Sequence, residues 1–297
     1  MKIAVMGAGA IGSYIGGRLA RAGHDVTLVA RPAHVAAIEA RGGLLIDSDN
    51  REDTVPLAAT ADPSGVAGAD LVLFTVKSAD TEPAGRSMQP HLSPTATILC
   101  LQNGVDNAER LSAAIGRPAV AAVVYVATRM EGPGHVRHHG RNELVIGPSD
   151  ASEAMAKLLT EAGIPTTVSE TVRAALWQKL VLNCCYNALS AVAQLPYRRL
   201  FEVPDTVEVI RNVVNECMAV ARALNIALPD DMFDQALAIA RLIPDQYSST
   251  AQDLARKKAT EIDYLNGYIV RKGRETGVPT PANLTLHVMV KLQEAAM

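Results

Sequence analysis

Three polar side chains lie at helical spacing within an apolar segment in the second half of the chain. Lys179, Asn183 and Asn187 recur at every fourth position, so a helix over Val172–Leu195 would place them on one stripe. An ammonium group beside two amides can bind a carboxylate and protonate a developing alkoxide. A polar stripe can also simply face water, as the polar side of most surface helices does. We therefore expect either acid chemistry on a carbonyl compound or a solvated helix face.

The first twelve residues contain a second group that could bind a ligand. A short apolar run ends in G-x-G-x-x-G, which comprises Gly7, Ala8, Gly9, Ala10, Ile11 and Gly12. In a dinucleotide-binding turn the first glycine makes the turn, the second lets the backbone approach a pyrophosphate, and the third lets the helix pack on the strand. The N–H groups at the helix start then hold the phosphates. A second apolar run, Asp25–Ala30, follows at the spacing of a βαβ unit, which favours dinucleotide binding over an ordinary glycine-rich turn.

Arg31 closes that second run, where an NAD-binding fold usually has an acidic residue for the ribose 2′-hydroxyl. No Asp or Glu occurs from Ala30 to Ala37. A guanidinium can bind a phosphate through two parallel hydrogen bonds. The alternative is a solvated loop arginine. The residue type favours NADP(H) over NAD as the cofactor.

Four further polar residues are candidates for a site. Lys77 and Asn103 each follow a strand-like run, and ligands of doubly wound sheets bind at the carboxyl ends of strands. Their simpler interpretations are a solvated strand end and an ordinary turn residue. Ser249 and Glu261 fall on one long expected helix, Ser249–Glu275. Alone, the serine is most simply a helix cap and the glutamate a solvated carboxylate.

The elements that would position these residues change character near residue 168. Up to that point short β-rich runs alternate with helical or loop segments, which predicts a mostly parallel sheet with helices on its faces. The turn at Gly132–Gly134 predicts antiparallel strands that extend the sheet. The expected strands are Ile3–Met6, Asp25–Ala30, Leu71–Val76, Ile98–Leu101, Ala119–Val126, Glu143–Ile146 and Pro165–Val168.

The second half shows helical periodicity interrupted by prolines. Capping-box spacing occurs at Asp205/Glu208 and Ser249/Gln252. The expected helices are Val172–Leu195, Asp205–Leu224, Asp230–Ile243, Ser249–Glu275 and Asn283–Ala296. The fold class is therefore α/β: an N-terminal Rossmann-type, doubly wound domain over 1–168, followed by an all-helical C-terminal domain over 169–297.

Composition excludes several classes of partner. The 297 residues suit about two domains, and 48% hydrophobic and 20% charged residues are ordinary for a globular protein. A net charge of −3 gives no reason to expect nucleic acid or an anionic membrane surface as a partner. The apolar runs are far shorter than the roughly 20 residues that span a bilayer. The oligomeric state is left open, a homodimer included.

The potential metal ligands show no metal-binding spacing. Buried free thiols in a reducing cytoplasm are expected for the four cysteines, Cys100, Cys184, Cys185 and Cys217. The cluster His135, His138 and His139 lies near a glycine- and proline-rich turn. We expect surface or hairpin histidines there, and no metal site.

Together these elements resemble the ketopantoate reductase family, the 2-dehydropantoate 2-reductases of pantothenate biosynthesis, along nearly the whole chain. The last two of the matching blocks are far more specific than the glycine motif. The blocks are Gly7–Gly12, Arg31, Val76-Lys77, Gln102-Asn103-Gly104, Leu176–Leu180 with Asn183 and Asn187, and Ser249-x2-Gln252-Asp253 leading into Thr260–Gly267.

The resemblance implies a reaction and its substrate contacts. NADPH would reduce the 2-oxo group of ketopantoate to pantoate by hydride transfer, with Lys179 as the general acid that also binds the keto acid. Asn183 and Asn187 would bind substrate, and Ser249 would hold its carboxylate. Asn103 would lie between the nicotinamide and the substrate.

The resemblance also implies cofactor contacts outside the glycine motif and Arg31. Glu261 would contact the cofactor and help to orient the catalytic site. Lys77 would lie beside the cofactor, and Thr128 would lie in a loop that lines the cofactor cleft.

One departure from the family concerns substrate choice. Many members have an asparagine shortly after the proline that ends the catalytic helix, where this chain has Pro196-Tyr197. Losing a hydroxyl partner can lower discrimination considerably, so a different branched or bulky 2-oxo acid is an alternative substrate. A non-catalytic NADP-binding sensor is an alternative of another class, although such a sensor would not need Lys179 and Glu261.

Overall fold

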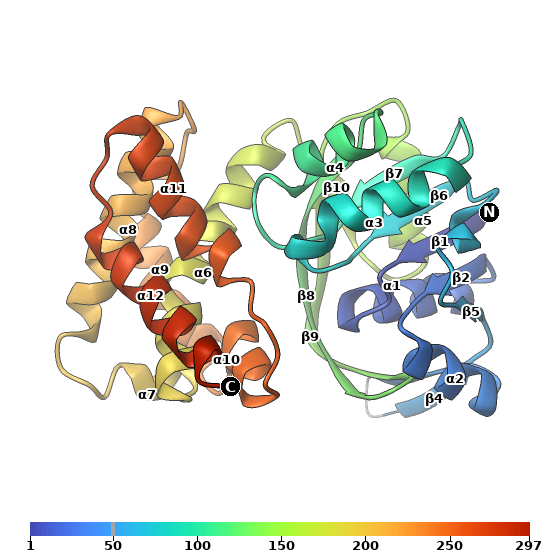
Figure 1. Ribbon diagram of the computed structural model, residues 1–297, viewed down its shortest axis with the longest axis horizontal. Helices are drawn as coiled ribbons and strands as arrows, with labels where there is room; N and C mark the ends of the chain where they lie inside the picture. The colour runs from blue at the N-terminus through green and yellow to red at the C-terminus, as the bar shows by residue number, and fades with distance from the viewer. Residues whose placement is uncertain (49–50) are drawn as a thin grey trace. The chain divides into compact units, whose positions relative to one another are not determined.

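The computed structural model describes residues 1–48 and 51–297, which divide into two compact units. Unit 1, Met1–Val172, is built around a sheet, and unit 2, Arg173–Met297, is built from helices (Figure 1). Among the helices of the described residues, none has the length and apolar character needed to cross a membrane.

Unit 1 contains a ten-stranded sheet. The strands are β1 (Lys2–Met6), β2 (Asp25–Val29), β3 (Leu44–Ser48), β4 (Arg51–Val55), β5 (Ala58–Thr60), β6 (Leu71–Phe74), β7 (Thr97–Cys100), β8 (Val120–Gly132), β9 (His135–Ile146) and β10 (Thr166–Val168). Their order is β4-β3-β9-β8-β7-β6-β1-β2-β5, and β10 pairs with β9. Strands β5, β2, β1, β6, β7 and the start of β8 run parallel, whereas β8 and β9 form an antiparallel hairpin. The predicted parallel sheet with an antiparallel extension is confirmed.

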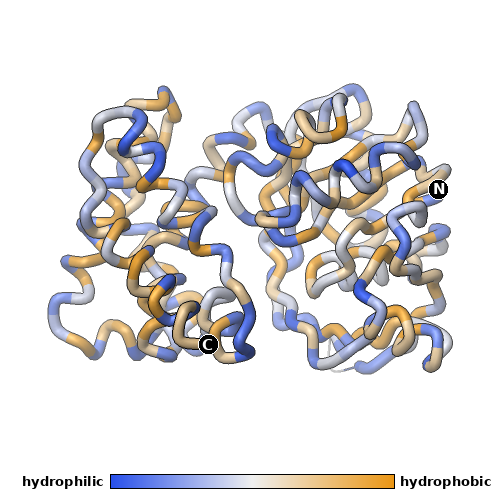
Figure 2. The backbone as a smooth tube through the Cα atoms, in the orientation of Figure 1, coloured by the Kyte–Doolittle hydropathy of each residue, from blue (hydrophilic) through white to orange (hydrophobic). Residues whose placement is uncertain are grey.

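Alternating side chains of the central strands supply a core on each face of this sheet. In β1, Ile3 and Val5 join one buried cluster, and Ala4 and Met6 join the other. Figure 2 shows the same strands as hydrophobic segments inside unit 1. The helices of this unit are α1 (Ala10–Arg21), α2 (Pro32–Arg41), η1 (Pro63–Val66), η2 (Ser78–Asp80), α3 (Thr81–Met88), η3 (Gln89–His91), α4 (Asn107–Ile115) and α5 (Ser152–Glu161).

Helices cover both faces of the sheet, as a doubly wound fold requires. Helices α1 and α5 contribute to the core that contains Ile3 and Val5, and α3 and α4 contribute to the opposite core. Helix α1 contacts β1 and β2 but also β8, β9 and β3, so the sheet curls around this helix. Chain order reverses at β1, which has β2 on one side and β6 on the other. Such a reversal marks the ligand-binding edge of doubly wound sheets.

Unit 2 is all-helical, as the sequence predicts. Its helices are α6 (Val172–Ala193), α7 (Tyr197–Leu200), α8 (Thr206–Ala223), α9 (Met232–Leu242), α10 (Ser249–Ala255), η4 (Ile262–Tyr264), α11 (Asn266–Thr276) and α12 (Pro281–Ala295). Helix α6 is held by neighbours on several sides. The Trp177 ring meets Tyr268 of α11 edge-on at 5.9 Å, and the Tyr186 hydroxyl donates to the Ala236 carbonyl of α9 at 2.6 Å.

The expected single helix over Ser249–Glu275 is wrong. The chain leaves α10 after Ala255, passes through Lys257 at φ +52°, and becomes α-helical again at Asn266. Both capping boxes are also wrong in detail. Ser248 rather than Ser249 caps α10, because its Oγ accepts from the Ala251 N–H at 3.0 Å. Asp205 precedes α8 at φ +63° but makes no side-chain cap.

Three strands were not expected from the sequence. Strand β4 (Arg-Glu-Asp-Thr-Val) has no apolar alternation, and it forms because its backbone pairs with β3. Strand β3 in turn pairs with β9, and β5 pairs with β2 over three residues. These pairings join segments distant in sequence, so local periodicity carries little trace of them.

Candidate active site

Four predicted site residues of unit 1 lie at one edge of its sheet. Gly7, Arg31, Lys77 and Asn103 follow the ends of β1, β2, β6 and β7, respectively, by at most three residues. Because these neighbouring strands are parallel, their carboxyl ends share that edge. The edge includes the switch point between β1 and β6, where doubly wound folds bind their ligands.

The three glycines of the β1–α1 turn have different surroundings. A Cβ at Gly7, whose φ is +95°, would lie 2.5 Å from Val76 Cγ1, and a Cβ at Gly12 would collide with Thr75 and Val5. At Gly9 a Cβ would meet only the Gly7 carbonyl oxygen, at 4.0 Å. Close packing against β1 and the chain after β6 therefore explains Gly7 and Gly12, while Gly9 leaves exposed backbone that a ligand can approach.

A dinucleotide fits this turn. Gly9 is the N-cap of α1 and has no side chain with which to cap the first-turn N–H groups. The first turn contains no acidic residue that would repel an anion. The Gly9 backbone and the N–H groups of Ala10, Ile11 and Gly12 are thus suited to a pyrophosphate.

Arg31 lies next to this turn, at the end of β2 and at the N-cap of α2. Its side chain is exposed. Across residues 1–48 and 51–297, no hydrogen bond or ion pair involves its guanidinium. The guanidinium is therefore accessible to a phosphate in solution.

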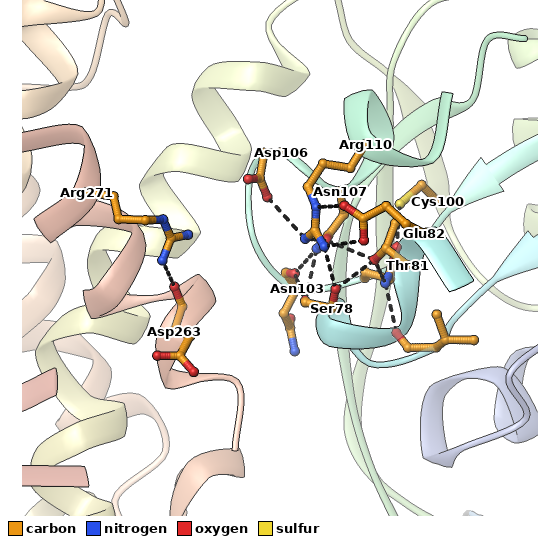
Figure 3. A network of polar contacts seen from close by, with 12 residues as sticks. Ser78, Thr81, Glu82, Cys100, Asn103, Asp106, Asn107, Arg110, Asp263 and Arg271 are labelled. Atoms are coloured by element: carbon orange, nitrogen blue, oxygen red, sulfur yellow. Dashed lines mark hydrogen bonds and ion pairs between the residues drawn. The ribbon is translucent and has the colours of Figure 1, made fainter. Parts of the chain in front are cut away.

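The loops that carry Lys77 and Asn103 are joined by a buried polar network (Figure 3). Ser78 Oγ donates to the Asn103 carbonyl at 3.1 Å, and Gln102 Nε2 donates to the Val76 carbonyl at 3.0 Å. Asn107 of α4 donates to the same Asn103 carbonyl. No motif in the sequence indicates this role for Ser78, Gln102 and Asn107, and only their position beside the two strand ends suggests it.

Thr128 lies on strand β8 rather than in a loop, so that expectation is corrected. It pairs with His138 of β9 next to a register shift in the hairpin. The His138 ring stacks on Tyr14 of α1 at 4.5 Å, which places this part of the hairpin beside α1. Thr128 Oγ1 is buried and has no hydrogen-bond partner within the described chain.

In unit 2, Lys179, Asn183 and Asn187 lie on α6 at the expected spacing. Lys179 and Asn183 are half-buried, and Asn187 is only 3% exposed, so a solvated face does not describe this end of the stripe. No side-chain hydrogen bond to either asparagine amide is found within the described residues. Neither amide is among the fully buried polar atoms of the described chain that lack a partner, so both remain open to solvent and to a polar ligand.

The start of α10 is hydrogen-bonded to the C-terminal half of α6, close to Asn187. Ser248 Oγ donates to the Asn187 carbonyl at 3.1 Å, and the Ser248 N–H donates to Ser190 Oγ at 3.2 Å. The neighbouring Ser249 is exposed and begins α10. Ser249 therefore directly follows a residue that is hydrogen-bonded to Asn187. The hydroxyl of Ser249 is not used as the helix cap, because Ser248 has that role.

Glu261 lies in a turn before η4 instead of on a helix shared with Ser249. Its neighbour Thr260 donates its N–H to Glu294 Oε1 of α12 at 2.7 Å. Five residues after Glu261, the buried Asn266 donates to the Cys184 carbonyl of α6 at 3.1 Å and to Asn283 Oδ1 at 3.0 Å. These bonds tie the Glu261 turn to α12 and the following helix to α6 beside Asn183.

A charged cluster supports the same turn. Asp263 accepts from His287 Nε2 at 2.7 Å and from Lys291 Nζ at 2.9 Å, and its backbone carbonyl accepts from Arg271 (Figure 3). Burial alone would raise the pKa of Asp263, but the bonds from His287 and Lys291 outweigh it and hold the pKa below its usual value. Burial would likewise raise the pKa of Glu294, but hydrogen bonds from Lys291 and Thr260 outweigh it and lower that pKa.

Tyr197, the residue that departs from the family pattern, is a core side chain. Its ring packs against Tyr186 with 4.6 Å between centroids, and burial raises the pKa of its phenol. The four cysteines are buried free thiols, as expected.

The histidine cluster lies on β9 of the hairpin. Within the described residues, Asp47, Glu52 and His135 place potential metal-ligand atoms within 4.8 Å of one another. Arg137 already donates to Asp47, so that carboxylate has a cationic partner from the protein. The expected absence of a metal stays a prediction.

Comparison with known proteins gives matches along the chain. The family described as ketopantoate reductase PanE/ApbA matches residues 3–151, and its C-terminal domain matches residues 171–294. A 2-dehydropantoate 2-reductase of Halobacterium salinarum is 32% identical over 302 residues, which cover 99% of each chain.

Solved structures agree with these matches. A PanE/ApbA family ketopantoate reductase from Ralstonia eutropha superposes with a TM-score of 0.97 at 55% identity, covering 100% of this chain and 99% of that one. A D-mandelate dehydrogenase, solved with NADH and anilino(oxo)acetate, has a TM-score of 0.92 at 27% identity and the same coverage. The chain therefore belongs to the ketopantoate reductase family of oxidoreductases.

Proposed function

We propose that this protein reduces ketopantoate to pantoate with NADPH. When bound, NADPH supplies the hydride to the carbonyl carbon, and Lys179 Nζ supplies the proton to the carbonyl oxygen, which leaves NADP⁺ and a secondary alcohol. The observation that carries the proposal is the α6 stripe, where Lys179 precedes two asparagines whose amides make no side-chain hydrogen bond within the described residues.

Unit 1 binds the cofactor in this proposal. The Gly7–Gly12 turn holds the pyrophosphate, and the exposed Arg31 binds the 2′-phosphate that distinguishes NADPH from NADH. Lys77 and Asn103 lie at the nicotinamide end, with Asn103 also facing the substrate. Thr128 contributes from β8.

Unit 2 binds the 2-oxo acid and completes the chemistry. Asn183 and Asn187 hydrogen-bond the substrate, and Ser249 binds its carboxylate. Glu261 contacts the cofactor and orients the site from its turn before η4. The division of roles follows the predicted domains, 1–168 for the cofactor and 169–297 for the substrate. We place the enzyme in the cytoplasm and leave a homodimer as the assembly to test by sedimentation.

A bulkier 2-oxo acid is the second candidate substrate. The D-mandelate dehydrogenase relative is named for an aromatic 2-hydroxy acid, and its structure holds anilino(oxo)acetate, which also carries an aromatic ring beside an oxo group and a carboxylate. In this chain the residue after Pro196 is a buried tyrosine ring, so the substrate-contacting asparagine of many family members is missing there. A change of this kind alters which group on the acid is recognised without altering the reduction itself.

The test is the rate of NADPH oxidation with a panel of 2-oxo acids. The highest kcat/KM for ketopantoate supports the proposal, and a higher value for phenylglyoxylate supports the second candidate. NADH measured in parallel tests the role of Arg31. NADPH binding without turnover of any acid would indicate a sensor instead of an enzyme.

A further inference from the structure

Four buried polar side chains lie close to the ends of β6 and β7, and none of the four has a role in the chemistry proposed above (Figure 3). They are Ser78, Thr81, Gln102 and Asn107. Asn107, at the start of α4, is only 2% exposed, and its neighbours Ser78 and Thr81 are also buried. Burying polar groups is costly unless their hydrogen bonds are made. The hydrogen bonds around Asn107 therefore show which parts of the backbone this network holds in place.

Both ends of the Asn107 amide are hydrogen-bonded. Its Nδ2 donates to the Asn103 carbonyl and to Ser78 Oγ, the latter at 3.1 Å. Its Oδ1 accepts from Arg110 Nη1 at 3.0 Å and lies 3.2 Å from Thr81 Oγ1, whose single hydrogen goes either to this oxygen or to the Ser78 carbonyl at 3.0 Å. Both N–H donors of the amide are therefore used, and its oxygen has a charged donor. One side chain thus joins the chain after β6 to the chain after β7.

An ion pair fixes the orientation of this amide. Arg110 binds both carboxylate oxygens of Glu82 at 2.7 Å and also donates to the Ser78 carbonyl at 3.0 Å. The hydrogen bonds from Arg110 lower the pKa of Glu82, so the pair stays charged at neutral pH. Because Arg110 can only donate, Asn107 must turn Oδ1 toward it and Nδ2 toward Asn103.

The bonds of this network lie on both sides of Lys77 and at Asn103. Gln102 holds the Val76 carbonyl before Lys77, and Ser78 follows Lys77 directly. The Asn103 carbonyl accepts from Ser78 and from Asn107. Gly104, at φ +103°, then lets the chain turn away. The network therefore fixes the backbone that aims both side chains.

We infer that Asn107 is a positioning residue for hydride transfer, which fixes Asn103 and the Lys77 loop at the nicotinamide end of the site without touching substrate or cofactor. The inference rests on the proposed function of Lys77 and Asn103. Loss of the Asn107 bonds should affect the nicotinamide end of the cofactor site and leave the phosphate-binding end unchanged, because the glycine turn and Arg31 make no bond to Asn107. A misplacement near 1 Å at the reacting end lowers rates by up to about 100-fold.

The test compares two substitutions at Asn107 with a matched control. Asn107→Ala removes every bond of the amide, whereas Asn107→Asp keeps the volume and an acceptor oxygen but replaces both N–H donors with a second carboxylate oxygen. Asn142→Ala is the control, because Asn142 also donates to a backbone carbonyl of unit 1, that of Gly163. The readouts are kcat, KM, the deuterium isotope effect with 4-deuterated NADPH, and the Kd of 2′,5′-ADP, which lacks a nicotinamide.

We expect kcat to fall about 10- to 100-fold in both Asn107 variants, with a larger isotope effect and an unchanged Kd for 2′,5′-ADP. Asn142→Ala should retain wild-type kcat. Asn107→Asp with wild-type kcat would overturn the inference, since it would leave the amide with a space-filling role. An equal loss of 2′,5′-ADP affinity in both variants would also overturn it and assign Asn107 to the folding of unit 1.

A separate readout distinguishes failure of the proposed function from failure of the positioning role of Asn107. If the wild-type protein binds NADPH but reduces no 2-oxo acid, the proposed function fails while the positioning role stays testable. The fluorescence of bound NADPH then reports the nicotinamide environment. A changed emission in both Asn107 variants, with unchanged 2′,5′-ADP binding, would support the inference, and an unchanged emission would overturn it.

Discussion

Lys179 has the sharpest predicted effect of any residue in the chain. Lys179→Ala should lower kcat by about 10²–10⁴, the usual range for loss of a general acid. Its KM for the 2-oxo acid should rise if the ammonium also binds the carboxylate, whereas NADPH affinity should change little. Lys179→Arg keeps the charge but releases no proton at neutral pH, so it should restore KM more than kcat. Steady-state kinetics and NADPH titration measure these effects.

The control for this series is Lys157→Ala, which removes an exposed lysine on α5 whose one ion pair within residues 1–48 and 51–297 is a 3.9 Å contact to Glu161. It should leave kcat and KM unchanged. Near-normal turnover of Lys179→Ala would show that the stripe on α6 has no acid role.

Arg31 tests the choice of cofactor in a single substitution. Arg31→Ala should weaken NADPH binding about 10- to 100-fold, because charge-assisted hydrogen bonds to a phosphate are lost. NADH binding should hardly change, since NADH lacks that phosphate. Fluorescence titration with both cofactors measures the difference. Equal weakening of both would mean that Arg31 binds some other part of the cofactor.

At the residue scale, sequence identifies the groups that meet a ligand better than the groups that hold them. The roles of Gly7 and Gly12 follow from the motif, and the structure gives the reason as close contacts with Val76, Thr75 and Val5. The roles of Asn107 and Ser248 do not follow from any spacing. Each depends on a group from a distant segment, Ser78 Oγ after β6 for Asn107 and the Asn187 carbonyl of α6 for Ser248.

Among the elements, the β1–α1 turn gives a prediction that separates folding from binding. Gly12→Ala places a methyl group against Thr75 and Val5, so it should lower the free energy of unfolding by about 1–3 kcal/mol. Gly9→Ala meets no protein atom closer than 4.0 Å, so stability should be kept while NADPH binding weakens. Thermal unfolding and NADPH titration of both variants measure the contrast. Unchanged NADPH affinity in Gly9→Ala would remove the pyrophosphate from this turn.

The turn that carries Glu261 gives a pH-dependent prediction. The pKa values of Asp263 and Glu294 are lowered in the folded chain, so their contribution to stability is complete above the unfolded pKa values of about 4. It is lost as pH falls through the lowered values. Lys291→Met removes a donor to both carboxylates, so the drop in Tm between pH 6 and 2 should shrink by up to about 3 °C.

Trp177 reports this transition. It is the one tryptophan of the chain, is 1% exposed and lies on α6 of unit 2. The control is Lys272→Met, which breaks the ion pair to Glu275 on α11 without affecting Asp263. An identical acid response in wild type and Lys291→Met would show that these ion pairs do not stabilise unit 2.

Elements with strong local periodicity were predictable, and those made by distant pairing were not. Helix α6 begins at the expected residue and ends two residues before the expected Leu195, because Pro196 prevents its continuation. The break after α10 was missed because its causes lie elsewhere. Glu294 of α12 and Cys184 of α6 accept the hydrogen bonds that hold the turn and the next helix in place.

For the whole molecule, the internal contacts divide the chain into two compact units. Unit 1 has a core on either face of its sheet. The family resemblance also divides along the same line, with separate matches to residues 3–151 and 171–294. The sequence indicated this division by the loss of β-rich runs after residue 168. The last backbone bonds of unit 1 extend slightly further, since Ser169 donates to Ile146 and Val172 to Ser169.

A fragment of residues 1–172 should therefore fold and bind nucleotide but catalyse nothing. It keeps all ten strands, the glycine turn and Arg31, so its Kd for 2′,5′-ADP should lie within about threefold of the full chain's value. Loss of even one charged hydrogen bond to this ligand would weaken binding by more than threefold, so a change within this limit means that unit 2 contributes no such bond. It lacks Lys179, Ser249 and Glu261, so NADPH oxidation with any 2-oxo acid should be undetectable. Circular dichroism confirms folding before the binding and activity measurements. Turnover by the fragment would move the proton donor into unit 1, and a folded fragment without nucleotide affinity would show that unit 2 residues contribute to the adenosine end of the site.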